Sequence, residues 1–130
     1  MDFRELAEKR LPDPMFHYID GAAEDEWTYK HNTSSFDKYE LVPRVLVDVD
    51  KIDTSINVLG QNIDWPFFCS PTGYSRLFHH DGEKGAVRAA ARAGTMFCLS
   101  TISTTTIEDV AKSSVGPKIF QIYVLKDRSL

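Results

Sequence analysis

The sequence predicts an α/β fold built on a parallel sheet, and three short apolar runs in its second half are the main observation. The runs span 67–72, 96–101 and 118–123, and each stops on polar or hydroxyl-bearing residues. Helix-like segments separate them, as the crossover connections of a parallel sheet require. Because sites gather where parallel strands end at their carboxyl side, we expect the residues at these strand ends to converge on one rim. They are Pro71, Thr72, Ser100, Gln121 and Tyr123.

The spacing of the runs favours an incomplete barrel. Successive strands are roughly 20 to 30 residues apart, so eight units would need on the order of 200 residues, close to a (β/α)8 TIM barrel. A complete doubly wound domain is the alternative, but its parallel sheet would end on an apolar, uncovered edge after Tyr123. We therefore expect the amino-terminal portion of a (β/α)8 barrel, with helices and a hairpin in 1–65 and the first three barrel strands in 66–130.

Short helices are expected at the start of the chain. Asp2 is positioned to cap the first helix. Asp13 is expected to cap the second, with Pro14 at its first helical position and Gly21 at its end. The acidic residues 24–26 suit the positive end of a third helix.

The middle of the chain changes character. Residues 41–53 are irregular with a β-leaning composition. Residues 55–59 and 62–63 then indicate a hairpin with a type II′ turn that starts on Gly60, because that turn prefers Gly first. We expect this hairpin to plug the bottom of the barrel.

Two crossover helices are predicted between the apolar runs. The first spans about 81–93, with small apolar residues on one face, and Gly94 supplies its stop. The second is short and has Thr106 as its cap.

Composition narrows the classes of function. Nineteen acidic against fifteen basic residues give a net charge of −4, which argues against nucleic acid as a partner. No apolar run approaches the ~20 residues that span a bilayer, and the charged start does not resemble a secretion signal. Cys69 and Cys98 are expected to be reduced thiols inside buried strands, so a cytoplasmic location is favoured.

The candidate site residues each have a structural explanation beside the functional one. The segment 71–73 could let a flat ligand approach the backbone, but a tight turn uses the same residues. Gln121 is unusual in an apolar run and must find partners, either in a ligand or in a neighbouring loop. Tyr123 is expected on the same strand face as Gln121. Tyr18 lies on a predicted helix, where an aromatic residue more often packs than reacts.

Other motifs give weaker signals. Residues 79–81 contain two adjacent histidines and an aspartate, but a solvated loop is the better interpretation than a metal site. The acidic residues within 48–53 lack the glycine and terminal glutamate of a calcium loop. We expect no metal. Neither a G-x-G-x-x-G motif nor a P-loop occurs, which weakens nicotinamide and nucleoside triphosphate hypotheses.

Taken together, several segments resemble the FMN-dependent 2-hydroxy acid dehydrogenases and oxidases. This family includes glycolate oxidase, flavin-type L-lactate dehydrogenase and mandelate dehydrogenase. The matching segments are Leu11-Pro12, 18–25, 43–49, 70–73, 94–101 and 120–124. They extend along nearly the whole chain.

The resemblance implies an FMN site at the carboxyl-end mouth of the barrel. Pro71, Thr72 and Gly73 would lie along the flavin, with their backbone near its reactive nitrogen. The family often has Ala at the third of these positions. Ser100 and Gln121 would hydrogen-bond the pyrimidine side of the ring.

The resemblance also implies the reaction and its substrate contacts. Tyr18 would bind the carboxylate of an (S)-2-hydroxy acid, and Tyr123 would stabilise charge near the substrate oxygen while the acid is oxidised to a 2-oxo acid. The catalytic histidine, a lysine beside the flavin and two arginines would come from later strands, so this chain alone is expected to be inactive. Ile102 stands where glycolate oxidase has tryptophan, which favours lactate or a larger substrate.

Further expectations follow from the same resemblance. The full-length protein is expected to form a homo-oligomer in the cytoplasm, with peripheral attachment at the inner membrane as an alternative. The electron acceptor stays open. Two other functions also stay open: a flavin-binding relative without turnover, and another FMN barrel of the isoprenoid isomerase type.

Overall fold

The computed structural model describes residues 2–126, and the chain forms two compact units that divide between Lys51 and Ile52. The predicted division of the domain at residue 65 stays a prediction, since compactness alone separates the chain earlier and keeps the hairpin with the second unit.

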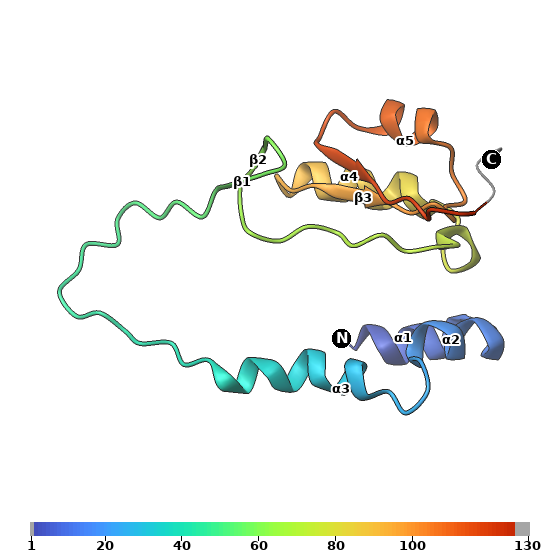
Figure 1. The fold of residues 1–130 in the computed structure, drawn as a ribbon, viewed down its shortest axis with the longest axis horizontal. Coiled ribbons are helices and arrows are strands. Elements are labelled where there is room, and N and C mark those ends of the chain that lie inside the picture. The colour runs from blue at the N-terminus through green and yellow to red at the C-terminus, as the bar shows by residue number, and fades with distance from the viewer. Residues whose placement is uncertain (1, 127–130) are drawn as a thin grey trace. The chain divides into compact units, whose positions relative to one another are not determined.

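The first unit is helical, as expected. It contains α1 (Phe3–Arg10), α2 (Asp13–Asp20), α3 (Trp27–Ser34) and the 3-10 turn η1 (Ser35–Lys38) (Figure 1). The carboxylate of Asp2 accepts from the backbone N–H of Arg4 at 2.9 Å, which confirms the predicted cap. The Arg4 guanidinium also binds the Asp20 carboxylate through two bonds of 2.6 and 2.9 Å, which joins α1 to α2.

One predicted boundary in this unit is wrong by a residue. Asp13 is already helical, and Pro12 takes the N-cap position of α2. Pro14 therefore stands one place further inside the first turn, where its missing N–H still costs no intrahelical bond. Gly21 caps the other end, as predicted.

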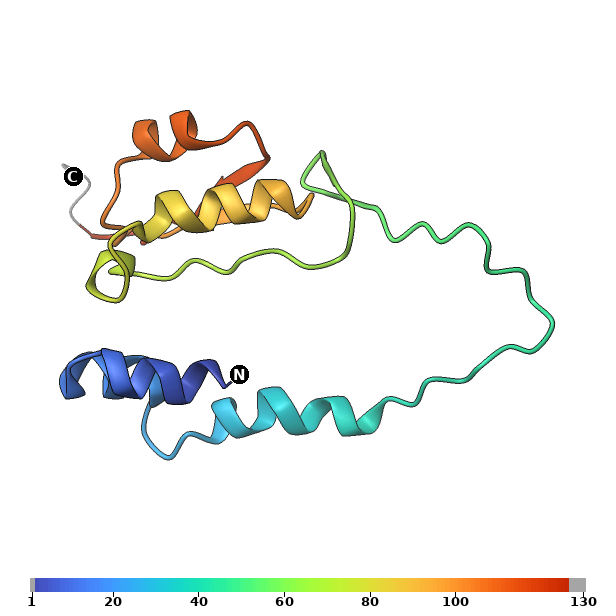
Figure 2. The same cartoon turned by 180° about the vertical axis from the view of Figure 1, so that it is seen from behind.

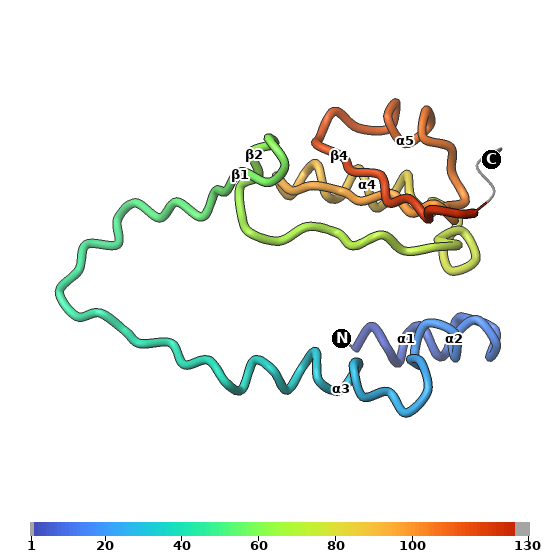
Figure 3. The backbone as a smooth tube through the Cα atoms, viewed as in Figure 1, coloured from blue at the N-terminus to red at the C-terminus, as the bar shows by residue number. Residues whose placement is uncertain are grey.

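The segment between the helices and the hairpin is irregular, as expected. Residues 39–55 form neither helix nor strand, and the tube in Figure 3 follows them without a coil.

The second unit begins with a β-hairpin. Strands β1 (Ile56–Val58) and β2 (Gln61–Ile63) pair antiparallel, with Val58 opposite Gln61. The turn therefore consists of Leu59 and Gly60, whose φ angles of 51° and 79° are both positive. Two positive φ angles define a type I′ turn, so the predicted type II′ turn starting on Gly60 is wrong.

A parallel sheet follows, covered by two helices. Strands β3 (Phe97–Leu99) and β4 (Lys118–Phe120) pair in parallel. Helices α4 (Gly82–Arg92) and α5 (Ile107–Ser113) are the predicted crossovers, and a 3-10 turn, η2 (Ser75–Leu77), precedes α4 (Figures 1 and 2). Their inner faces form the core with the sheet; its members are Val87, Ala90, Phe97, Leu99 and Val110.

The first predicted strand is much shorter than expected. Cys69 alone pairs in parallel with Phe97, donating to Met96 O and accepting from the N–H of Cys98, both at 3.1 Å. Pro66 and Pro71 flank this segment and have no N–H to donate, which limits the ladder. Cys69 is consequently exposed, contrary to the prediction that both cysteines are buried.

The other cysteine behaves as predicted. Cys98 is buried in β3, and burial raises the pKa of its thiol, so it stays protonated and unreactive. Neither cysteine forms a disulfide.

Candidate functional site

The loops that follow β3 and β4 bring two predicted site residues together. Ser100 directly follows β3 and Gln121 directly follows β4. The side-chain oxygen of Gln121 accepts from the backbone N–H of Thr101 at 3.2 Å and from the Ser100 hydroxyl at 3.4 Å. The predicted meeting of Ser100 and Gln121 on one rim is therefore confirmed. The neighbouring loop satisfies the acceptor of Gln121.

The side-chain amide nitrogen of Gln121 differs from its oxygen in its hydrogen bonding. Within residues 2–126 its amide nitrogen donates no hydrogen bond, although the residue is half-buried. The side chain is thus fixed through its oxygen while its two N–H groups remain for a ligand.

Thr101 is a rim residue that the sequence analysis missed. Its hydroxyl donates to the backbone carbonyl of Gln121 and accepts from the backbone N–H of Tyr123 at 3.1 Å. These bonds fix the backbone that carries Tyr123. The available signal was a second hydroxyl residue directly after Ser100 at the end of the same strand.

The segment Pro71-Thr72-Gly73 lies at the end of the Cys69 segment. Pro71 and Thr72 are exposed, and the backbone N–H of Tyr74 donates to the carbonyl of Ile102 at 3.1 Å. This bond ties the segment to the loop after β3. A Cβ on Gly73 would stand only 2.6 Å from Cδ1 of Ile102, so a larger residue here would require the Ile102 side chain to move.

The two candidate tyrosines are in different units. Tyr123 follows β4, is 55% exposed, and its hydroxyl makes no hydrogen bond within the described part of the chain. Tyr18 lies on α2 of the first unit and is also exposed. A common site formed by both residues stays a prediction.

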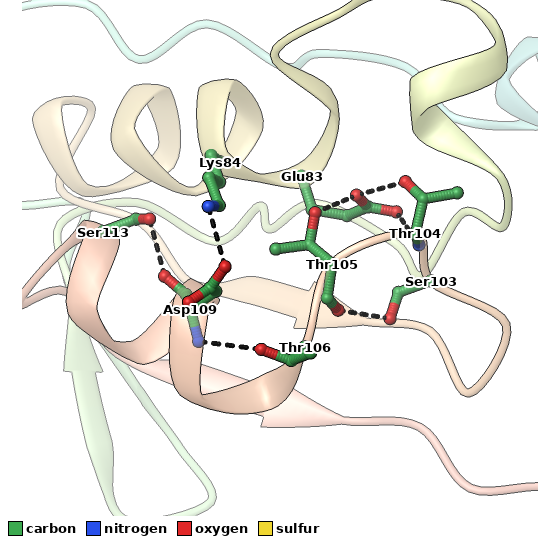
Figure 4. A network of polar contacts seen from close by, with 8 residues as sticks. All are labelled: Glu83, Lys84, Ser103, Thr104, Thr105, Thr106, Asp109 and Ser113. Carbon is green, nitrogen blue, oxygen red and sulfur yellow. Dashed lines mark hydrogen bonds and ion pairs between the residues drawn. The ribbon is translucent and has the colours of Figure 1, made fainter.

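A second feature that sequence reasoning missed is the buried carboxylate of Glu83 in the first turn of α4. It is 1% exposed and accepts from the Thr104 N–H at 2.8 Å and from the Thr104 and Thr105 hydroxyls at 2.7 Å each (Figure 4). Burial alone would raise its pKa, but these donors outweigh burial and lower the pKa to about 2. The signal was its spacing, because Glu83, Val87 and Ala90 share one helix face.

The histidine pair forms an exposed cluster. Ligand atoms of His79, His80 and Asp81 lie within 4.8 Å of one another, and all three residues are exposed. The Asp81 carboxylate already contacts Arg88 at 3.3 Å and His80 at 3.5 Å. This exposure agrees with the expected solvated loop.

Comparison with known proteins identifies the class. Residues 7–130 match the FMN-dependent dehydrogenases. Glycolate oxidase 3 of Arabidopsis thaliana is 40% identical over all 130 residues, which make up 35% of that protein. The chain thus spans about a third of the length of this relative.

Solved structures give the same result. A soluble mutant of the membrane-associated (S)-mandelate dehydrogenase from Pseudomonas putida is 40% identical with a TM-score of 0.87, covering 95% of this chain and 36% of that one. A mandelate oxidase variant with a C4a-OH-FMN adduct is 30% identical with a TM-score of 0.89, covering 98% and 38%.

These similarities establish both the fold and the family of the chain. The described units are the amino-terminal portion of a (β/α)8 barrel, as predicted. The chain belongs to the FMN-dependent dehydrogenase family. Among residues 2–126, the helices are all too short or too polar to cross a bilayer.

Proposed function

We propose that the full-length protein oxidises an (S)-2-hydroxy acid to the 2-oxo acid with bound FMN. The observation that carries the proposal is the hydrogen-bonded rim of Ser100, Thr101 and Gln121 at the carboxyl end of the sheet. The loop that carries Ser100 and Thr101 is also bonded to the 71–74 segment. Relatives named for oxidation of glycolate, mandelate and lactate support the reaction class.

The rim residues fit a flavin. The pyrimidine edge of an isoalloxazine presents carbonyl acceptors, which match the unused N–H groups of Gln121. A flat ring needs close access to backbone, and Gly73 has no side chain to obstruct it, while Pro71 and Thr72 are exposed. When bound, FMN supplies the two-electron oxidation that no amino-acid side chain here can perform.

The chain's own residues bind and orient. Ser100 and Gln121 hold the polar edge of the cofactor. The hydroxyl of Tyr123 donates a hydrogen bond to the substrate oxygen, where negative charge develops as the alcohol proton leaves. Tyr18 donates to the substrate carboxylate. The proton acceptor, a flavin-side lysine and the arginine partners of the carboxylate come from later strands in this proposal.

The substrate is proposed to be lactate or a larger 2-hydroxy acid. Ile102 is half-buried and packs over Gly73. By the family resemblance, it stands where glycolate oxidase has a bulkier tryptophan. The smaller side chain leaves room for a substituent larger than that of glycolate.

We propose a cytoplasmic homo-oligomer, with peripheral attachment at the inner membrane as the alternative that cell fractionation would separate.

Purified full-length protein tests the function directly. It should be yellow, and anaerobic addition of L-lactate or L-mandelate should bleach it, with D-lactate as the matched control. A yellow protein that no 2-hydroxy acid bleaches would favour the non-catalytic relative or the isomerase type. A colourless, folded protein that cannot be loaded with FMN would overturn the proposal.

A variant tests the role of Tyr123. Tyr123→Phe removes one hydroxyl that has no partner within residues 2–126, so the fold should be retained. Loss of a donor to a developing oxyanion lowers kcat on the order of 10²-fold. FMN content and melting temperature should stay at the wild-type values, and an unchanged kcat would remove Tyr123 from the mechanism.

A further inference from the structure

We infer that Glu83 is a positioning residue for the flavin site, acting as a clamp on the loop after β3 without touching the cofactor. The clamp is defined as Glu83 with Thr104 and Thr105. The inference rests on the proposed function, because it assigns this clamp to the flavin-binding rim.

The clamp consists of three donors from one loop converging on one carboxylate. Oε1 of Glu83 accepts from the Thr104 N–H, and Oε2 accepts from both threonine hydroxyls. Figure 4 shows Glu83 between these two residues. Glu83 belongs to α4, whereas Thr104 and Thr105 belong to the loop between β3 and α5, so the bonds join two elements at the same end of the sheet.

The charge of Glu83 is buried without a cation. Among the described residues it forms no ion pair, and the adjacent Lys84 binds Asp109 at 2.8 Å instead. Burying a carboxylate without a cation is costly unless hydrogen-bond donors compensate, and apolar residues often stabilise a helix-to-loop contact at least as well. A carboxylate at this position is therefore better explained by the geometry it imposes on its donors.

The imposed geometry extends from Glu83 to the flavin segment. Since the Thr104 hydroxyl donates to Glu83, its lone pairs are free to accept the backbone N–H of Arg76 at 3.2 Å. The Tyr74 N–H donates to Ile102 in the same loop. These two hydrogen bonds form a relay, in which the Arg76 N–H donates to the Thr104 hydroxyl and that hydroxyl donates to Glu83. The relay fixes the residues that immediately follow Gly73.

Ser100 is held from the same loop. Its hydroxyl accepts from the Ile102 N–H at 3.2 Å while it contacts Gln121. A loop anchored at Thr104 and Thr105 thus keeps both sides of the proposed flavin site, the 71–73 segment and Ser100, at a fixed separation. Release of the clamp should loosen cofactor binding before it unfolds the sheet.

The test uses full-length protein and compares variants of the clamp with a control in the core. Glu83→Gln keeps the shape but supplies N–H groups where the hydroxyls need an acceptor. Thr104→Val removes the relay hydroxyl, and Thr104→Ser retains it. Val110→Ala removes buried apolar contacts between α5 and the core without touching the clamp. The measurements are the dissociation constant of FMN, the flavin absorption spectrum, kcat, KM and the melting temperature.

Glu83→Gln and Thr104→Val should each weaken FMN binding by about tenfold or more and alter the flavin spectrum, since each disrupts the relay. Thr104→Ser should remain within about twofold of wild type, and Val110→Ala should lower the melting temperature with FMN affinity within about twofold. If Glu83→Gln fails to fold, the comparison of Thr104→Val with Thr104→Ser decides.

Two results would overturn the inference. One is FMN affinity within about twofold of wild type in folded Thr104→Val and Glu83→Gln. The other is an equal loss of affinity in Val110→Ala at an equal loss of melting temperature, which would indicate a purely structural role. A wild-type protein that binds no FMN would overturn the proposed function and this inference together; wild-type binding with unaffected variants overturns the clamp alone.

Discussion

The two ends of the parallel sheet are built from different chemistry. At the amino end, backbone carbonyls are the acceptors: the Asp64 N–H donates to the Gly94 carbonyl at 2.9 Å, and the Trp65 indole donates to the Ala93 carbonyl at 2.8 Å. These bonds attach the segment after the hairpin to the end of α4. At the carboxyl end, hydroxyl, amide and carboxylate side chains form the contacts, and the amide N–H groups of Gln121 have no acceptor among residues 2–126.

This difference separates stability from function. Contacts at the amino end are completed within the chain, so changes there should alter the free energy of unfolding and leave cofactor binding intact. The carboxyl end combines internal bonds with unused donors, so changes there should affect ligand binding as well. Barrel enzymes divide their two faces in the same way. The following substitutions test the division, and all are made in the full-length protein.

The largest expected effect is the acid sensitivity contributed by Glu83. The pKa of this carboxyl is about 2 in the folded protein, below its ordinary value of 4.5. A lowered pKa stabilises the fold above pH 4.5, and the contribution, about 3 kcal/mol, is lost as the pH falls from 4.5 towards 2. Denaturant unfolding at several pH values should show this loss in wild type.

Two variants isolate that contribution. Glu83→Gln should remove the additional slope below pH 4.5. Asp109→Asn should leave most of the slope in place, because the exposed Lys84–Asp109 pair is screened by water. Equal slopes in wild type and Glu83→Gln would show that the Glu83 carboxylate does not stabilise the carboxyl end.

The next effect is at the amino end. Gly94 has a φ of +66°, and a Cβ there would lie 1.8 Å from a carboxylate oxygen of Asp64. Gly94→Ala should therefore lower the free energy of unfolding by about 2–3 kcal/mol, through backbone strain and displacement of Asp64. The melting temperature should fall while the FMN dissociation constant stays within about twofold of wild type.

Gly60 supplies the matched control. Its φ is +79°, but a Cβ would meet nothing within 4 Å. Gly60→Ala should cost only about 1 kcal/mol, the strain without the collision. Loss of FMN in Gly94→Ala at temperatures where the protein is folded would contradict the separation of the two ends.

A smaller effect is expected from Gln121, at the carboxyl end. Gln121→Glu keeps the oxygen that accepts from Thr101 but removes the N–H donors. FMN binding should weaken about tenfold, since a carboxylate would face the flavin carbonyls, while the melting temperature changes little. Equilibrium titration of apoprotein with FMN measures this. Unchanged affinity would mean that the amide N–H groups do not bind the cofactor.

Much of this arrangement follows from sequence pattern. The apolar face of α4, the stop at Gly94 and the cap at Thr106 are local features, and the structure confirms all three. The rim contact between Ser100 and Gln121 was predictable because parallel strands end at a common edge. Each of these predictions needed only neighbouring residues and the topology.

The failures concern interactions between distant segments. The strand around Cys69 reads as long because Phe67 and Phe68 are apolar, yet only one residue pairs. The spacing of Glu83 places it on the buried face of α4, but only its partners, more than twenty residues later, show why a carboxylate is buried there. Tertiary contacts of this kind are not encoded in local periodicity.

The smallest expected effect tests how the two rim loops fit together. A Cβ at Gly73 would collide with Cδ1 and Cγ1 of Ile102, at 2.6 and 2.7 Å, but these atoms can move by rotation of the side chain. Gly73→Ala should therefore cost only about 1 kcal/mol, and Ile102→Val, which removes Cδ1, should recover part of it in the double variant. Unfolding free energies and FMN affinities of both single variants and the double variant measure the coupling. Non-additive changes in both the unfolding free energy and the FMN affinity would show that packing between these loops sets the width of the flavin site. Strictly additive changes would show that the loops adjust independently and that hydrogen bonds alone hold the rim.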